Sequence, residues 1–150
     1  MMYKIGSYIA VVLWMGLIFF FSSEPADDSK ELSTGVTEVI LSVVEAVSPD
    51  SDLFMENLHH FVRKNAHFFI YFVLGMLVRR ALRLSEIRGK KGNVLALAIC
   101  IVYAISDELH QLFVPGRGAQ VKDVVIDSTG ALVGIIIYSS IRWIGRKRKA

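Results

Sequence analysis

The chain has 150 residues, of which 53% are hydrophobic, with a formal net charge of +3 and a mean hydropathy of +0.48. This length allows one domain, and the long apolar runs are typical of a helical membrane protein rather than a soluble core. The single cysteine, Cys100, excludes an internal disulfide, and its apolar surroundings argue against a reactive thiol. The sequence also lacks a glycine-rich phosphate loop and a nucleophile elbow.

Four apolar runs predict an all-α protein with four transmembrane helices, at approximately residues 5–22, 61–84, 94–114 and 123–143. The first run follows a single Lys4 and precedes no small-residue cleavage pattern, so we expect a retained span rather than a signal peptide. The second and third runs are short, and they cross a bilayer only if their helices extend into charged residues.

Residues 24–60 differ in kind from the apolar runs. They are acidic, and apolar residues recur at helical spacing from Leu32 to Val47. We expect one or two amphipathic helices that lie on the membrane surface. A lid over a site is the alternative, which the sequence does not decide.

Loop charges predict the orientation. The loop between the second and third spans is strongly basic, and so is the tail at 142–150. The positive-inside rule places this loop and both termini in the cytoplasm, with residues 24–60 and the turn at Pro115 outside. The basic tail fits anionic lipids of the inner leaflet, so no nucleic acid is needed as a partner. We therefore expect a multi-pass protein of the bacterial cytoplasmic membrane.

This topology brings polar residues from the outer ends of three spans together. Residues spaced by three or four positions share a helix face, and the second, third and fourth spans each have one polar face. The predicted site consists of Arg63, Lys64, His67 and Tyr71, then Asp107, Glu108, His110 and Gln111, then Arg117, Asp123 and Asp127.

Asp127 lies about one turn inside the fourth apolar run, where a charged carboxylate is costly unless a basic group pairs with it. The candidates for that group are a histidine, Arg63, Arg117 and Lys122. Gly130 and Gly134 follow on the same face. Their spacing lets another helix approach closely and offers a contact for an oligomer.

Three interpretations of the polar residues stay open. In the first, four acidic residues balanced by four basic ones form a network that only holds the helices together. In the second, Arg63 and Arg117 clamp an anionic lipid headgroup, and a histidine with a carboxylate acts as acid and base. The candidate acid–base groups are His67, His110, Asp107 and Glu108.

In the third interpretation, a divalent metal ion binds there, although the spacing matches no tight metal signature. The candidate ligands are His67, His110, Asp107, Glu108, Asp123 and Asp127. Proton-coupled transport is disfavoured, because the chain has only four predicted spans and no internal repeat.

Three motifs resemble the VanZ-like family of small bacterial membrane proteins. They lie at Arg63–Gly75, Asp107–Arg117 and Asp123–Gly134, and the resemblance covers roughly residues 60–138 well. It implies a helical integral membrane protein without a settled enzymatic activity. The family takes its name from a member linked to low-level teicoplanin resistance. That branch is less polar at the positions of Asp107 and His110, so this chain is similar to a more acidic branch.

We therefore expect a polar pocket at the outer leaflet that binds or acts on a cell-envelope lipid or a lipid-linked precursor. The resemblance raises a link to glycopeptide (teicoplanin) susceptibility. The alternative is a non-catalytic accessory protein of the envelope, whose charged network only stabilises the helix bundle. The sequence does not decide whether the protein is an enzyme.

Overall fold

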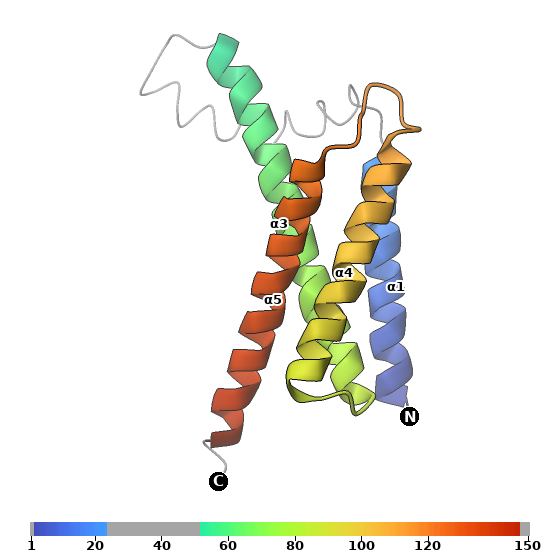
Figure 1. The fold of residues 1–150 in the computed structure, drawn as a ribbon, viewed down its shortest axis with the longest axis vertical. Coiled ribbons are helices and arrows are strands. Elements are labelled where there is room, and N and C mark those ends of the chain that lie inside the picture. Colours follow the sequence, from blue (N-terminus) through green and yellow to red (C-terminus); the bar gives the residue numbers. More distant parts are fainter. Residues whose placement is uncertain (1, 24–51, 148–150) are drawn as a thin grey trace.

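The computed structural model describes residues 2–23 and 52–147, with side chains described for 2–23 and 65–144. All the regular secondary structure in this part of the chain is helical, as predicted. Its helices are α1 (Met2–Ser23), α3 (Asp52–Leu84), α4 (Gly89–Gln111) and α5 (Val121–Lys147). Figure 1 shows them as an upright bundle, in which α1 and α4 run in one direction and α3 and α5 in the other.

Three of these helices are long and apolar enough to cross a membrane: Met2–Ser23, Gly89–Gln111 and Val121–Ile144. The α3 helix is not among them. With 33 residues it is long enough, at about 50 Å, but charged residues interrupt it, including Arg79, Arg80 and Arg83 near its end. The prediction of four spans is therefore supported for three helices.

Several boundaries differ from the predicted ones. Residues 52–60, which we expected in a separate amphipathic segment, belong to the continuous helix α3, while 24–51 lie outside the described residues. The start of α3 extends past the other helices in Figure 1. The α4 helix ends at Gln111 rather than Val114, because the chain turns there through a hydrogen bond from the Val114 amide to the Gln111 carbonyl. The α5 helix continues through the predicted tail to Lys147.

The most extensive contact joins α3 and α5, which run parallel to each other. A Cβ added at Gly130 would overlap the carbonyl oxygen of Phe68, and one at Gly134 would overlap the carbonyl oxygen of Phe72. The two backbones touch where no side chain intervenes, as expected for this glycine spacing. Both glycines are buried against α3 of the same chain, and an oligomer through them stays an untested prediction.

Two side-chain hydrogen bonds hold α1 against the bundle. The Trp14 indole donates to the carbonyl of Ile70 in α3 (2.9 Å), and the Tyr103 hydroxyl in α4 donates to the carbonyl of Met15 (2.6 Å). They fix α1 beside both neighbouring helices. The α1 helix thereby forms one wall behind the polar residues of α3 and α4.

Large apolar side chains cover the outside of the helices. Examples are Val12, Leu13, Phe20, Val94 and Val102, each between 59% and 69% exposed. A soluble monomer rarely exposes so much contiguous apolar surface, whereas helices in a bilayer present such a surface to lipid. The exposed apolar surface and the three apolar helices together indicate a membrane protein.

Candidate functional site

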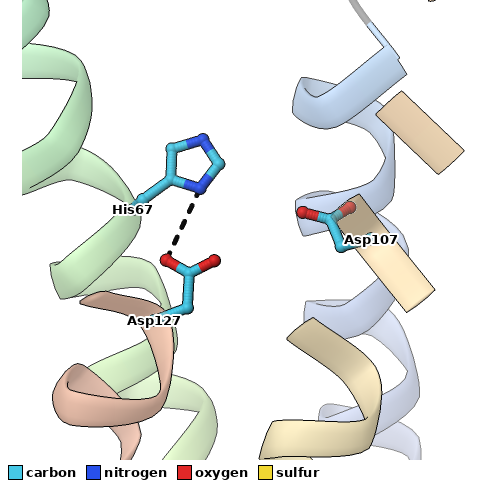
Figure 2. Close-up of side chains that lie close together, drawn as sticks. All are labelled: His67, Asp107 and Asp127. Atoms are coloured by element: carbon cyan, nitrogen blue, oxygen red, sulfur yellow. Dashed lines mark ion pairs between the residues drawn. The ribbon is translucent and has the colours of Figure 1, made fainter. Parts of the chain in front are cut away.

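Three helices each bring one titratable side chain to a common point inside the bundle. These are His67 from α3, Asp107 from α4 and Asp127 from α5, and one ligand atom of each lies within 4.8 Å of the others. Figure 2 shows the His67 ring next to the Asp127 carboxylate, with Asp107 facing them from the opposite side. We call these three residues the His–Asp–Asp centre.

Both carboxylates of the centre are buried: Asp107 is 2% exposed and Asp127 is fully buried. None of their four oxygens makes a hydrogen bond within the described part of the chain. The Ser22 hydroxyl of α1 lies near Asp107 but does not meet hydrogen-bond geometry with it. Because burying an uncompensated charge costs several kcal/mol, these two groups need a partner that the side chains described do not supply.

His67 is the nearest group that can carry positive charge. Its Nδ1 lies 3.6 Å from Oδ1 of Asp127, which is an ion-pair distance but too long for a hydrogen bond. Among the predicted partners of Asp127, the histidine is the one that the structure places beside it. Lys122 is exposed, and the Arg117 Nη2 donates to the carbonyl of Phe21 at the end of α1 (3.3 Å). The side chains of Arg63 and Lys64 are not among those described.

Tyr71 follows His67 by one turn of α3 and is fully buried. Its hydroxyl makes no hydrogen bond with the residues described, and it is close enough to Asp107 and Asp127 for electrostatic interaction. The ring centroid of Tyr103 lies 6.2 Å away. Beside the two carboxylates, Tyr71 is therefore a third buried polar group that makes no hydrogen bond with the described residues.

His110 and Gln111 lie against α1 and not at the His–Asp–Asp centre. The His110 ring stacks on Phe19 with centroids 4.3 Å apart, and its Nε2 lies 3.1 Å from the Ser23 hydroxyl. Gln111 donates from Nε2 to the Ser22 hydroxyl (3.0 Å). Both side chains tie the end of α4 to the end of α1, which is a positioning role.

Ser22 and Ser23 were not among the predicted site residues. The signal for them was present, because two hydroxyl residues directly follow the aromatic run that ends the first apolar segment. Ser22 is 1% exposed and accepts the Gln111 hydrogen bond described above. The end of α1 is therefore a polar wall next to Asp107.

Glu108 and Asp123 lie between α4 and α5. Glu108 is 4% exposed, and its Oε2 accepts a hydrogen bond from the Gln120 amide (2.7 Å), just before α5 begins. Its Oε1 and the Oδ1 of half-buried Asp123 make no hydrogen bond with described groups. Glu108 thus fixes the start of α5, the helix that carries Asp127.

The distances in the centre suit a metal ion better than a direct hydrogen bond. Ligand bonds to zinc of about 2.0–2.2 Å at tetrahedral angles separate two ligand atoms by roughly 3.3–3.6 Å. The 3.6 Å between His67 Nδ1 and Asp127 Oδ1 falls at this value, and a ligand atom of Asp107 lies within 4.8 Å of both residues. Two carboxylates also supply the two negative charges that balance a divalent cation. Three protein ligands leave one position open, as in catalytic sites.

The same residues also support acid–base chemistry. A carboxylate beside one imidazole nitrogen holds the ring in one tautomer and one orientation. Asp127 lies beside Nδ1 of His67 and electrostatically favours a proton there, which leaves Nε2 to exchange a proton with a bound molecule. Both uses rest on the same three side chains.

Three apolar helices and a buried centre of one histidine and two aspartates define a helical membrane protein with a polar core. The family model VanZ/LLP1 matches residues 7–143, and the chain therefore belongs to the VanZ/LLP1 family. This confirms the resemblance seen in the sequence. Neither the curated proteins nor the solved structures gave a match.

Proposed function

We propose that this VanZ-family protein binds and acts on an anionic cell-envelope lipid, or a lipid-linked precursor, through the His–Asp–Asp centre. One observation carries the proposal: two buried carboxylates from different helices meet without hydrogen bonds among the residues described. Ionisable groups inside a membrane bundle are expensive, and they are retained where they serve a ligand. A centre that faces a bound molecule explains why the oxygens of Asp107 and Asp127 make no hydrogen bond with the described residues.

We assign a divalent metal ion, zinc by its ligand types, as the group that compensates the two carboxylates. An imidazole suits zinc, and carboxylate oxygens complete its ligand set. When bound, the ion supplies a Lewis acid that attracts the anionic group of the substrate and lowers the pKa of a bound water. Asp107 and Asp127 would hold the ion, and the Ser22–Gln111 pair would fix the wall of α1 beside it.

We further propose that α3 crosses the membrane as a fourth span, with both termini on the cytoplasmic side of the bacterial membrane. Support comes from the contact of α3 with α5, because α5 is apolar enough to span and α3 follows it through Gly130 and Gly134. The low hydropathy of α3 comes partly from residues that face the bundle. Arg79, for example, is 5% exposed and does not face lipid. With this orientation the centre belongs to the outer half of the bilayer.

The accessory role, in which charges only hold the helices together, is less well supported. A stabilising network would pair its buried acids with bases. In the described part of the chain, the ion pair of Asp127 is with a histidine, and Asp107 forms none. Glu108 and Arg117 do make contacts of the structural kind, to Gln120 and Phe21.

The test is a metal analysis of the full chain, purified in neutral detergent without chelator or affinity metal. We expect one zinc per chain in the wild type and a loss of zinc in Asp107→Asn, Asp127→Asn and His67→Gln. Asp123→Asn is the matched control, because Asp123 is a nearby carboxylate outside the cluster. No stoichiometric metal in a folded wild type would contradict the metal assignment.

The cellular arm separates a site from a scaffold. Each variant is expressed in a strain that lacks the chromosomal copy, and envelope lipids and glycopeptide (teicoplanin) susceptibility are measured. We expect the three variants of the centre to behave as the deletion does while folding normally in detergent. If all three fail to fold while Asp123→Asn folds, the centre is structural and the proposed function falls.

A further inference from the structure

At the opposite end of the bundle, the end of α3, the start of α4 and the end of α5 enclose a hollow of about 520 Å³. This volume is in the range of small-ligand pockets. Five basic side chains line it, and no acidic side chain among the described residues does: Arg79, Arg83, Arg88, Lys90 and Arg142. We propose that this basic hollow binds the phosphate group of an anionic phospholipid.

Arg79 is the anchor of the basic hollow. It is 5% exposed, its Nε donates to Oδ1 of Asn93 (2.6 Å), and its Nη1 donates to the carbonyl of Ile87 (3.3 Å). The Ser139 hydroxyl of α5 donates to the same Asn93 oxygen (3.0 Å), which fixes the amide from the other side. These bonds are to neutral groups, so a cation that is largely removed from water has no counter-charge among the side chains described. A bound anion supplies it.

The first turn of α4 faces the same hollow. It carries basic side chains, whose positive charge is unfavourable at the N-terminus of a helix. Arg88 is the residue before the helix and makes no side-chain cap, and the first turn contains no acidic residue. Lys90 lies in that turn, where the helix dipole disfavours cations. The backbone amides at the start of α4 and the nearby basic side chains both attract a phosphate.

Gly92 makes this packing possible. A Cβ at this position would lie 2.6 Å from the carbonyl oxygen of Ile87 and 3.0 Å from Cζ of Arg79. The guanidinium therefore packs against the bare backbone of α4, within reach of its first turn. The only described acid in this loop, Glu86, pairs with Arg88 at the surface and does not line the hollow.

The location of the hollow favours a lipid headgroup as the source of the phosphate. Trp143 lines it and is 55% exposed, and Ile141 and Ile144 beside it are 62% and 48% exposed. Tryptophan next to exposed aliphatic side chains is typical of the membrane–water interface. The positive-inside rule alone would explain a loop whose basic side chains are exposed. It does not explain Arg79, because this side chain is buried and held by hydrogen bonds.

The experiment uses the full chain, delipidated in neutral detergent and titrated with phosphatidylglycerol or with phosphatidylcholine of the same acyl chains. Native mass spectrometry counts the retained lipids and gives their affinities. The lining variant is Lys90→Gln with Arg142→Gln. The matched control, Arg80→Gln with Lys91→Gln, also removes two exposed charges near this end, but neither residue lines the hollow.

We expect one phosphatidylglycerol per chain, bound more tightly than phosphatidylcholine. The lining variant should lose about tenfold in affinity or more, as for a lost charge-assisted contact, and the control should lose less than about twofold. Equal losses in both variants, or equal binding of the two lipids, would overturn the site. A third arm adds inorganic phosphate alone. Phosphate that binds as tightly as phosphatidylglycerol would overturn the lipid as its source.

Discussion

At one end of the bundle two buried carboxylates meet a single imidazole, and at the other five bases surround a hollow. The acidic end lies between the helices, and its carboxylate oxygens make no hydrogen bond with the described residues. At the basic end the buried Arg79 is anchored by Asn93. The two ends therefore suit ligands of opposite charge: a cation inside the bundle and an anion at the membrane interface.

The largest expected effect is at the contact between α3 and α5, two helices that reach both ends of the bundle. Gly134→Leu forces a side chain into the backbone of α3 at Phe72, and we expect it to lower the free energy of unfolding by about 3 kcal/mol or more. Thermal unfolding in detergent measures this. Gly16→Leu is the control, since nothing lies within 4 Å of a Cβ there, and its effect should stay within about 0.5 kcal/mol. A stable Gly134→Leu protein would mean that α3 and α5 do not touch.

The second effect separates the unsatisfied acidic end from the anchored basic end. In metal-free protein, Asp127→Asn removes a buried charge that faces only His67 and makes no hydrogen bond with the described residues, and we expect it to stabilise the fold by about 1–3 kcal/mol. Arg79→Met removes a hydrogen-bonded group and leaves Asn93 with one donor fewer, so we expect it to destabilise by about 1–2 kcal/mol. Urea unfolding of both variants gives the sign of each change in the free energy of unfolding. Two effects of the same sign would end the contrast between the ends.

The third effect concerns which histidine belongs to the acidic end. His110→Phe keeps the stack on Phe19 and loses only the contact with Ser23, so we expect a cost below about 1 kcal/mol and unchanged zinc content. His67→Phe should abolish zinc binding, because His67 is the only imidazole in the described cluster. Mass spectrometry measures the zinc content of each variant, and thermal unfolding measures its stability. Zinc lost in His110→Phe but kept in His67→Phe would reverse the assignment.

The smallest effect is at the rim of the basic end. Glu86→Gln removes the surface partner of Arg88, and both side chains are about two-thirds exposed. Surface pairs contribute little, so stability should change by less than about 0.5 kcal/mol. Phosphatidylglycerol affinity should rise by no more than about twofold, because Arg88, which already lines the hollow, then loses its counter-charge. A clear fall in affinity would show that Glu86 supports the hollow.

Much of the fold and part of the centre could be predicted because the signals are local. Apolar runs indicated the membrane helices, and helical spacing indicated the polar faces that carry His67, Asp107 and Asp127. The glycine spacing on α5 also predicted a close helix contact, which α3 makes. Helix ends were less predictable, because the turn after Gln111 is held by local backbone hydrogen bonds together with the contact between Glu108 and the Gln120 amide.

His110 shows why spacing alone overestimates a site. It follows Asp107 on the same helix at a distance that permits a shared face, yet its ring stacks on Phe19 of α1. Rotation of α4 about its axis decides which of its polar residues face α3 and α5 and which face α1. That rotation depends on packing along the whole helix, which the local pattern does not contain.

The sequence alone determined an all-helical membrane protein with a polar core and charged ends, because hydropathy and helical period are properties of neighbouring residues. Only the tertiary structure decided which charges meet. It brought Asp107 and Asp127 to His67, placed His110 against α1, and buried Arg79 over Gly92 to form the basic hollow. The physical reason is that contacts between helices depend on their relative rotation and depth, and the close packing of the whole bundle sets both.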